Sequence, residues 1–273
     1  MQRRGGLHKW RHNPGQWRDV DALNAHVFSR TELLLGTAAM ERLNRANVIV
    51  FGIGGVGGYA SEALTRCGIG HITLVDHDFI NITNINRQIH AAHSTLGQLK
   101  VDAMTCRLMD INPDAVVKKV SRFYSRGMGQ EIFSEHFDYI LDCIDTVTCK
   151  LDVVAEACSR GIPIISCMGT GNKLDPSRFR VSDISRTRDC PLARTMRKEL
   201  RKRGVNHLKV VYSQECPISL SENELHTEML REQSADSPSR RAVPGSISFV
   251  PSAAGLLMAG EVIKDILNLR LGV

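Results

Sequence analysis

Residues 51–100 read FGIGGVGGYASEALTRCGIGHITLVDHDFINITNINRQIHAAHSTLGQLK, and they hold the strongest fold signals of the chain. Just before the glycines, residues 47–51 (NVIVF) have the β-branched composition of a buried strand. After the glycines, apolar residues repeat at helical spacing on one face: Val56, Tyr59, Ala60, Ala63, Leu64 and Cys67. The turn between strand and helix is a G-x-G-x-x-G motif, made by Gly52, Gly54 and Gly57, with Gly55 inside it. Such a turn lets backbone N–H groups approach an anion at a helix N-terminus, so we predict a nucleotide site rather than a ligand-free turn.

A second strand, HITLVD, ends on Asp76, nineteen residues after Gly57. That is about the spacing at which a carboxylate meets the ribose hydroxyls in a dinucleotide-binding fold. Two cations follow: Arg87 after the polar run NITNIN, and Lys100 at the start of an expected helix. Two cations reaching toward one phosphate loop suit a triphosphate, whose charge must be offset before its α-phosphorus can be attacked. The alternative is that each cation is an ordinary solvated surface charge.

The rest of the chain predicts a doubly wound, Rossmann-like α/β fold with a mostly parallel sheet and a smaller C-terminal strand and helix extension. Further strands are expected at 115–120, 138–143 and 163–167, with helices at 126–136 and 148–160. Asp145 falls just beyond the strand DYILDC, at the rim where ligands bind in such sheets. Asp142 is nearer the strand body, where a buried, hydrogen-bonded acid or a helix-capping partner is expected.

Positive charge concentrates between residues 178 and 209, which hold eleven basic residues against three acidic ones in a chain whose net charge is +6. Two strands, 179–184 and 209–213, are expected around a helix at about 191–203 that carries the candidate nucleic-acid contacts Arg194, Arg197, Lys198, Arg201, Lys202 and Arg203. A cluster this lopsided would attract a polyanion, whereas the alternative is a solvated helix face.

The 273 residues, 42% of them hydrophobic, fit one large domain at 25–273, with a nucleotide part at about 25–170 and a substrate part at about 171–273. Residues 1–24 form a basic tail without an apolar signal-peptide core, which we expect to be disordered; a mitochondrial presequence is the weaker alternative. Residues 247–260 are apolar but too short to span a bilayer, so we expect a buried strand and a core helix there, no membrane partner and a cytoplasmic protein. The eight cysteines contain no C-x-x-C pair, so neither a disulfide framework nor a four-thiolate zinc site is indicated.

The motifs GIGGVG, TNINRQIH, GQLK and DCIDTV resemble those of the adenylating enzymes related to ubiquitin-activating enzymes, the MoeB/ThiF/HesA superfamily. Within it, the segments FSRTELLLG, KLDPSRFRVSDI, DCPLARTMRKELRKRG and PGSISFVPSAAG most resemble the tRNA threonylcarbamoyladenosine dehydratases. The resemblance runs from about residue 28 to 269 and implies an ATP-dependent cyclisation of the modified nucleoside through an acyl-adenylate.

The resemblance also implies a role for each candidate residue. ATP would lie on Gly52, Gly54, Gly55 and Gly57, with Asp76 on its ribose and Asn84, Arg87 and Lys100 completing the nucleotide site. Asp145 would hold Mg²⁺. The catalytic set would be Arg87, Lys100, Asp145 and Arg30, the last reaching the ATP of the neighbouring protomer in a homodimer. The partners implied are tRNA and, as for some dehydratases of this family, a cysteine desulfurase system.

Three other functions remain open at this point. Adenylation of a ubiquitin-like sulfur-carrier protein uses the same chemistry, but relatives that do this often carry C-x-x-C pairs or a loop cysteine. The crossover loop expected at 219–244 has no cysteine, and Cys216, just before it, is expected to be an ordinary small residue. An NAD-dependent oxidoreductase would not need the two cations. A non-catalytic nucleotide-binding module would not need so complete a set of polyphosphate contacts.

Overall fold

Six strands lie side by side as parallel neighbours in the computed structural model, and a seventh pairs antiparallel at one edge. The structure describes residues 26–220 and 244–269, and these seven strands are those of the described ranges. In chain order they are β1 Asn47–Phe51, β2 His71–Val75, β3 Val116–Val120, β4 Tyr139–Asp142, β5 Ile164–Cys167, β6 Phe179–Asp183 and β7 Lys209–Ser213. Their order across the sheet is β3-β2-β1-β4-β5-β7-β6. The predicted Rossmann-like α/β fold is confirmed.

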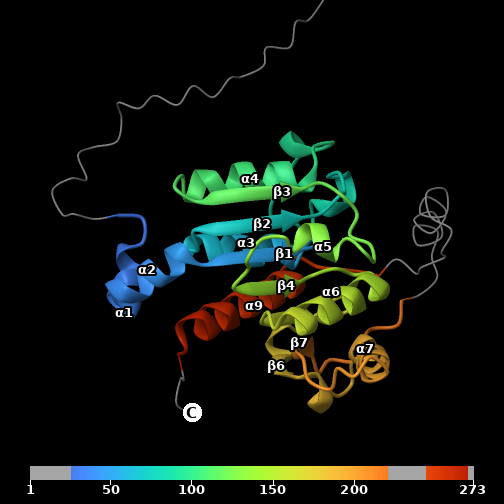
Figure 1. Ribbon diagram of the computed structural model, residues 1–273. Helices are drawn as coiled ribbons and strands as arrows, with labels where there is room; N and C mark the ends of the chain where they lie inside the picture. The colour runs from blue at the N-terminus through green and yellow to red at the C-terminus, as the bar shows by residue number, and fades with distance from the viewer. Residues whose placement is uncertain (1–25, 221–243, 270–273) are drawn as a thin grey trace, which may run out of the picture.

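Helices cover both faces of this sheet (Figure 1). α3 and α4 pack with α9 against one face, while α5 and α6 cover the other. In the described ranges the α-helices are α1 Ser29–Leu35, α2 Thr37–Arg45, α3 Gly57–Arg66, α4 Lys100–Ile111, α5 Gly129–Ile132, α6 Val147–Arg160, α7 Pro191–Arg201 and α9 Phe249–Leu267. The predicted tail at 1–24 and most of the predicted loop at 219–244 lie outside the described residues.

β1 is buried on both faces, which explains its unbroken apolar sequence. Val48 and Val50 point into the core beneath α3 and α9, whereas Ile49 and Phe51 point into the core beneath α5 and α6. Each is fully buried, and burying such a side chain contributes about 1.5–3 kcal/mol. The strand therefore anchors both layers and fixes where the glycine turn emerges.

The carboxyl ends of β1 and β4 lie at the point where the strand order reverses direction. From β1 the chain moves to β2 and β3 on one side and then crosses to β4 on the other. In doubly wound sheets, ligands bind in the crevice outside the carboxyl ends of the strands at this point. The glycine turn follows β1 and Asp145 follows β4, so the topology brings them to the same crevice.

The C-terminal part is built into the same sheet, because β7 pairs with β5 across the boundary predicted near residue 170. The buried strand predicted within residues 247–260 is wrong, since the segment from Phe249 onward is helical. Pro251 is the third residue of α9, where the N–H group that proline lacks has no intrahelical acceptor. In the described ranges no helix is long and apolar enough to cross a membrane.

α9 supports the helix that follows the glycine turn. A Cβ on Gly255 would lie 2.4 Å from the Val56 carbonyl oxygen and 3.1 Å from the Ala60 nitrogen, so only glycine permits this close approach of α9 to the start of α3. Packing of the two helices therefore holds the N-terminus of α3 in place beneath the crevice.

Candidate nucleotide-binding and active site

The turn after β1 requires glycine at two positions. Gly52 has φ +84°, and a Cβ there would lie 2.8 Å from the Cys143 carbonyl oxygen. A Cβ on Gly57 would lie 1.9 Å from the Gly52 carbonyl oxygen. Gly54 and Gly55, between them, are half-buried. At the start of α3, a ten-residue helix, the N–H groups of Gly58 and Ala60 donate to the Gly54 and Val56 carbonyl oxygens, each at 3.0 Å. Other N–H groups of the turn and of the first helical turn are the candidate donors to a phosphate.

Asp76 lies one residue beyond β2 and contacts the glycine turn directly. Its Oδ2 accepts a hydrogen bond from the Ile53 N–H at 2.6 Å, and its Oδ1 accepts one from the Asp78 N–H at 2.8 Å. Burial raises the pKa of Asp76, although the charge of Lys100 and the two N–H donors act in the opposite direction. Each carboxylate oxygen can accept a further hydrogen bond, so the placement is compatible with ribose hydroxyl donors.

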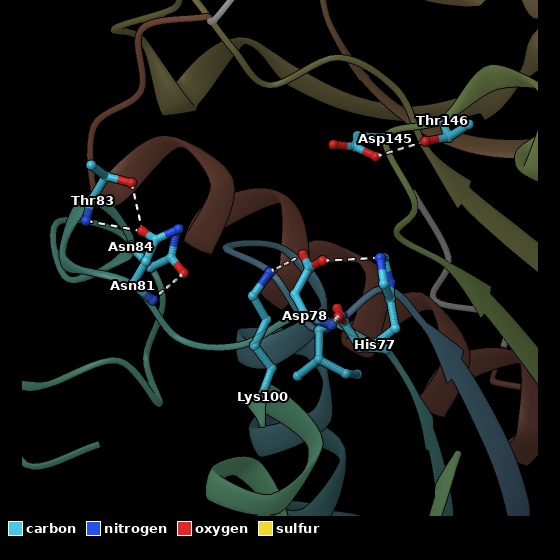
Figure 2. Close-up of polar contacts among 10 residues, drawn as sticks. His77, Asp78, Asn81, Thr83, Asn84, Lys100, Asp145 and Thr146 are labelled. Atoms are coloured by element: carbon cyan, nitrogen blue, oxygen red, sulfur yellow. Dashed lines mark hydrogen bonds and ion pairs between the residues drawn. The ribbon is translucent and has the colours of Figure 1, made fainter. Parts of the chain in front are cut away.

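Lys100, the first residue of α4, is almost fully buried and is held twice by Asp78 (Figure 2). Its Nζ lies 2.5 Å from Asp78 Oδ2, and its backbone N–H donates to the Asp78 carbonyl oxygen at 3.0 Å. Because Asp78 also binds Asp76, one residue links the candidate ribose acid to the candidate phosphate cation. Asp78 was not predicted from the sequence, where its only signal is its place two residues after Asp76.

Arg87 lies beside the glycine turn, since a Cβ on Gly55 would be 3.3 Å from the Arg87 carbonyl oxygen. Its Nη1 donates to the Thr83 carbonyl oxygen at 2.9 Å, and in the described part of the chain no carboxylate forms an ion pair with it. Burial lowers the pKa of the Arg87 guanidinium. Asn84 is buried and accepts from the Asn81 N–H at 3.1 Å, which closes the turn before Arg87 (Figure 2). A partly buried arginine that pairs with no carboxylate in the described residues, beside a phosphate loop, suits binding of a polyphosphate.

Asp145 is exposed on the loop between β4 and α6. Its Oδ1 accepts a hydrogen bond from Thr146 Oγ1 at 3.2 Å (Figure 2). In residues 26–220 and 244–269 it forms no ion pair with a basic side chain. Its oxygens therefore remain able to bind a cation.

The loop that carries Asp145 rests on a buried ion pair. Asp142 and Lys150 are both fully buried, and Lys150 Nζ lies 2.9 Å from Asp142 Oδ2. Ser166 Oγ also donates to Asp142 Oδ2, at 2.5 Å. Lys150 Nζ also donates to the Ile144 carbonyl oxygen at 3.1 Å, while Asp142 Oδ1 accepts from the Ile144 N–H at 3.2 Å. Asp142 is thus the buried, hydrogen-bonded acid expected from its place in the strand, and it holds the backbone next to Asp145.

Asp76, His77 and Asp78 place one ligand atom each within 4.8 Å of one another, a spacing that a metal ion could bridge. Both carboxylates already hold other groups, however: Asp76 accepts two backbone N–H groups, and Asp78 binds the ammonium of Lys100. Asp145 is exposed and forms no ion pair within the described residues, so it remains the better candidate ligand for Mg²⁺.

Two buried polar side chains beside the glycine turn have atoms without a hydrogen-bond partner in the described residues. These atoms are Gln88 Oε1 and both ring nitrogens of His90. A Cβ on Gly58 would lie 3.2 Å from His90 Nδ1, so the ring sits against the start of α3. Burial, with the charges of Lys100 and Arg107, lowers the pKa of His90 to about 4, and the ring is neutral at pH 7. Neither residue was predicted from the sequence.

The six basic residues predicted for nucleic acid divide into three groups. Arg197 is turned inward, where its Nη1 donates to Thr187 Oγ1 at 2.6 Å and to the Ile184 carbonyl oxygen at 3.1 Å. Lys202 and Arg203, beyond the end of α7, both pair with Glu199. The remaining three share one exposed face at i, i+4 and i+7 and form no ion pair within the described residues: Arg194, Lys198 and Arg201. We therefore restrict the candidate surface on α7 to these three.

Arg30 is exposed on α1, far from the glycine turn of its own chain. Figure 1 shows α1 and α2 beside the amino ends of the strands. Phe28 confirms this place, since a Cβ on Gly68, in the turn before β2, would lie 3.8 Å from its ring. The five residues of β1 separate this end of the sheet from the glycine turn by about 17 Å. The structure does not bring Arg30 together with the other predicted site residues of the same chain.

Comparison with known proteins places this site in a family. Residues 28–271 match the model of the ThiF family. The chain belongs to the ThiF family. It is 44% identical over 247 residues to a tRNA threonylcarbamoyladenosine dehydratase from Bacillus subtilis, which covers 89% of this chain and 95% of that protein. The match to a relative over nearly its whole length assigns this ThiF-family chain to the dehydratase branch.

Solved structures agree with that assignment. The crystal structure of the Escherichia coli tRNA N6-threonylcarbamoyladenosine dehydratase TcdA in complex with ATP matches with a TM-score of 0.77 and 30% identity, over 88% of this chain and 93% of that one. A molybdopterin-synthase adenylyltransferase from Escherichia coli is 32% identical, but over only 46% of this chain and 50% of that protein. The sulfur-carrier alternative is therefore the more distant one.

Proposed function

We propose that this chain catalyses the ATP-dependent dehydration of N6-threonylcarbamoyladenosine in tRNA through an acyl-adenylate. The observation that carries the proposal is its 44% identity to the Bacillus subtilis dehydratase over 89% of the chain. The site supports the proposal, because a glycine turn, the half-buried Asp76 and two cations gather where the strand order reverses. TcdA of Escherichia coli, crystallised with ATP and with AMP, matches this chain over 88% of its length, which supports ATP as the nucleotide.

ATP would lie along the carboxyl edge of β1. Backbone N–H groups of the glycine turn and of the α3 N-terminus would bind its phosphates, and Asp76 would accept hydrogen bonds from its ribose hydroxyls. Arg87 and Lys100 would offset the phosphate charge, which makes the α-phosphorus easier to attack by an anion. Lys100 would meet the phosphates while its bond to Asp78 keeps the ammonium in place.

After ATP has activated the carboxylate, the reaction needs no separate molecule to accept the acyl group. An oxygen of the threonine carboxylate forms a bond to the α-phosphorus, and the bond to the β-phosphate oxygen breaks, releasing pyrophosphate. A nucleophilic group of the same modified base attacks the activated carbonyl carbon and gives up its proton, and AMP leaves with the former carboxylate oxygen. The substrate thereby loses the elements of water. Ring closure within one molecule is favoured because the reacting groups are already held together.

Asp145 would hold Mg²⁺ against the phosphates, with the remaining ligands from ATP and water, as magnesium commonly uses one or two carboxylates. When bound, Mg²⁺ would supply further neutralisation of phosphate charge. The carboxylate of Asp145 fits this role because it is exposed and forms no ion pair within the described ranges. The Asp142–Lys150 pair beneath it keeps the loop in position.

The change Asp145→Asn should raise the Mg²⁺ concentration needed for half-maximal activity and lower turnover by about tenfold or more, because an amide is a weaker ligand than a carboxylate. ATP binding without Mg²⁺ should be unchanged. The measurement is a magnesium titration of pyrophosphate release. Asp110→Asn, an exposed acid on the outer side of α4, is the matched control. An unaltered titration in Asp145→Asn would remove this residue from the metal site.

The surface made by Arg194, Lys198 and Arg201 would bind tRNA phosphates. Changing all three to glutamine should weaken tRNA binding and reduce the slope of log affinity against log salt by about one for each phosphate that the surface no longer binds. ATP binding should not change. Neutralising Lys118, Lys119 and Arg122, at the opposite end of the sheet, is the control of equal charge. If the two triple variants have equal tRNA affinity and equal salt slopes, this face of α7 is an ordinary solvated surface and does not bind tRNA.

Pyrophosphate release tests the function as a whole. We expect release when tRNA carrying the threonylcarbamoyl group is added with ATP and Mg²⁺, and none with tRNA lacking it. Substrate labelled with ¹⁸O in the carboxylate should yield AMP that contains the label, because that oxygen leaves on the phosphate. Release on addition of a ubiquitin-like carrier protein alone would instead support the sulfur-carrier alternative.

We further propose that the enzyme acts as a homodimer in which Arg30 of one protomer reaches the ATP of the other. The place of α1 at the amino edge of the sheet supports contribution in trans, because Arg30 is too distant from its own glycine turn. A tRNA substrate would place the enzyme in the cytoplasm. A cysteine desulfurase partner, and the assignment of residues at about 171–273 to a substrate part of the single domain, stay predictions.

A further inference from the structure

Lys173 is a buried cation without an anionic partner in the described residues. It lies in the segment after β5 and is 3% exposed. Its Nζ donates a hydrogen bond to the main-chain carbonyl oxygen of Glu215. The Glu215 carboxylate does not pair with it and instead accepts from the Leu174 N–H at 2.9 Å and the Asp175 N–H at 3.0 Å. An ammonium has three donors, so the carbonyl satisfies only part of this group.

The other buried lysines of the described ranges show that this is unusual within the molecule. Lys100 pairs with Asp78 at 2.5 Å, and Lys150 pairs with Asp142 at 2.9 Å. A buried charge is costly unless an opposite charge meets it, and burial lowers the pKa of Lys173. Such a group is retained most readily where a ligand supplies the missing charge.

Lys173 lies in the segment that leaves the sheet at its carboxyl edge, after β5. Along this edge the order is β1 with the glycine turn, β4 with Asp145, and β5 with the segment that leads to Lys173. Neighbouring strands are about 4.8 Å apart, so the ends of β1 and β5 are separated by about 10 Å. An acyl group joined to the α-phosphate could extend over that distance toward β5.

Hydrogen bonds also connect the segment that contains Lys173 to the residue before Arg87, one of the two candidate phosphate-binding cations. The Asn172 N–H donates to the Gly245 carbonyl oxygen at 2.8 Å, and the Gly245 N–H donates to Asn172 Oδ1 at 2.6 Å. One residue further, the Ser246 carbonyl oxygen accepts from Asn86 Nδ2 at 3.0 Å. Asn86 directly precedes Arg87, so the two segments are held in fixed relation.

We propose that Lys173 binds the carboxylate of the threonyl group on the modified adenosine and orients it for attack on the α-phosphorus. This inference rests on the proposed function. Lys173 exchanges no atoms in the reaction: the carboxylate oxygen bonds to phosphorus, pyrophosphate leaves, and the ammonium stays charged. tRNA without the threonylcarbamoyl group lacks the anion, so Lys173 would help the enzyme to select modified tRNA.

The test compares two variants that separate charge from hydrogen bonding. Lys173→Met removes both, whereas Lys173→Gln keeps an N–H donor for the Glu215 carbonyl oxygen and removes only the charge. Both should raise the KM for modified tRNA by about tenfold or more, the effect of losing a charge-assisted hydrogen bond. Both should also lose the preference for modified over unmodified tRNA in binding. The dissociation constant for ATP should stay unchanged, and Lys173→Arg should recover part of the lost affinity.

Leu174→Ala is the matched control, because it alters the same segment at an exposed apolar side chain and should behave as the wild type. Thermal melting of each variant verifies folding. If Lys173→Gln keeps wild-type KM and selectivity, the lysine serves only as a donor to Glu215 and the inference is wrong. If the wild type itself releases no pyrophosphate with modified tRNA, the proposed function fails instead, whatever the variants do.

Discussion

Lys100→Met lowers the rate of pyrophosphate release by about 10²-fold to 10³-fold under the proposed mechanism. The Lys100 side chain is almost fully buried and its ammonium lies against Asp78, so water would screen it little. Methionine has nearly the length of lysine without its charge, and Asp78 is half-exposed, so its carboxylate can be solvated after the change. The fold should therefore persist while transition-state stabilisation is lost. Single-turnover pyrophosphate release with saturating ATP measures this effect.

Lys119→Met is the control for Lys100→Met. Lys119 also forms an ion pair, with Asp102 at 2.6 Å, but both side chains are about half exposed. An exposed pair of this kind contributes about 0–1 kcal/mol, so its loss should change neither rate nor stability by much. If Lys100→Met binds ATP normally and retains a rate within about threefold of the wild type, Lys100 is not the phosphate cation.

The nucleotide half of the fold could be predicted because its signals are local. The β-branched run of β1, the glycine spacing and the apolar face of α3 are each read within a few residues. The same holds for Asp142 and Asp145, where a difference of three positions along the chain separates a buried acid from an exposed one. In a parallel sheet, the place along the strand fixes which residues reach the carboxyl edge.

The features that could not be predicted depend on contacts between distant segments. A count of basic residues cannot show that Arg197 bonds to Thr187 or that Glu199 takes up Lys202 and Arg203. Lys173 likewise looks like one more surface lysine until β5 and β7 bring its segment against Glu215. At Phe249 the local strand signal was overridden, because the packing of α9 on α3 requires a helix there.

If the enzyme is a dimer with shared sites, Arg30 should be needed in the partner's site and not in its own. Leu33 and Leu34, on the same helix, are 88% and 82% exposed, which is costly for adjacent leucines unless another surface covers them. In a symmetric dimer each site would combine Lys100 of one protomer with Arg30 of its partner. Arg30→Ala and Lys100→Ala proteins should each be nearly inactive alone. Mixed in equal amounts, they should regain about a quarter of wild-type activity, because about half of the dimers are mixed and each has one intact site.

The reciprocal mixture gives the matching control. The double variant Arg30→Ala/Lys100→Ala, mixed equally with wild type, should leave about a quarter of the sites active, because each mixed dimer lacks Lys100 in one site and Arg30 in the other. If Arg30 acted within its own chain, about half of the sites would stay active and the first mixture would show no recovery. Subunit exchange is verified with protomers of different mass. A monomer in solution, or no recovery after confirmed exchange, would exclude the shared site and leave Arg30 as a surface residue of α1.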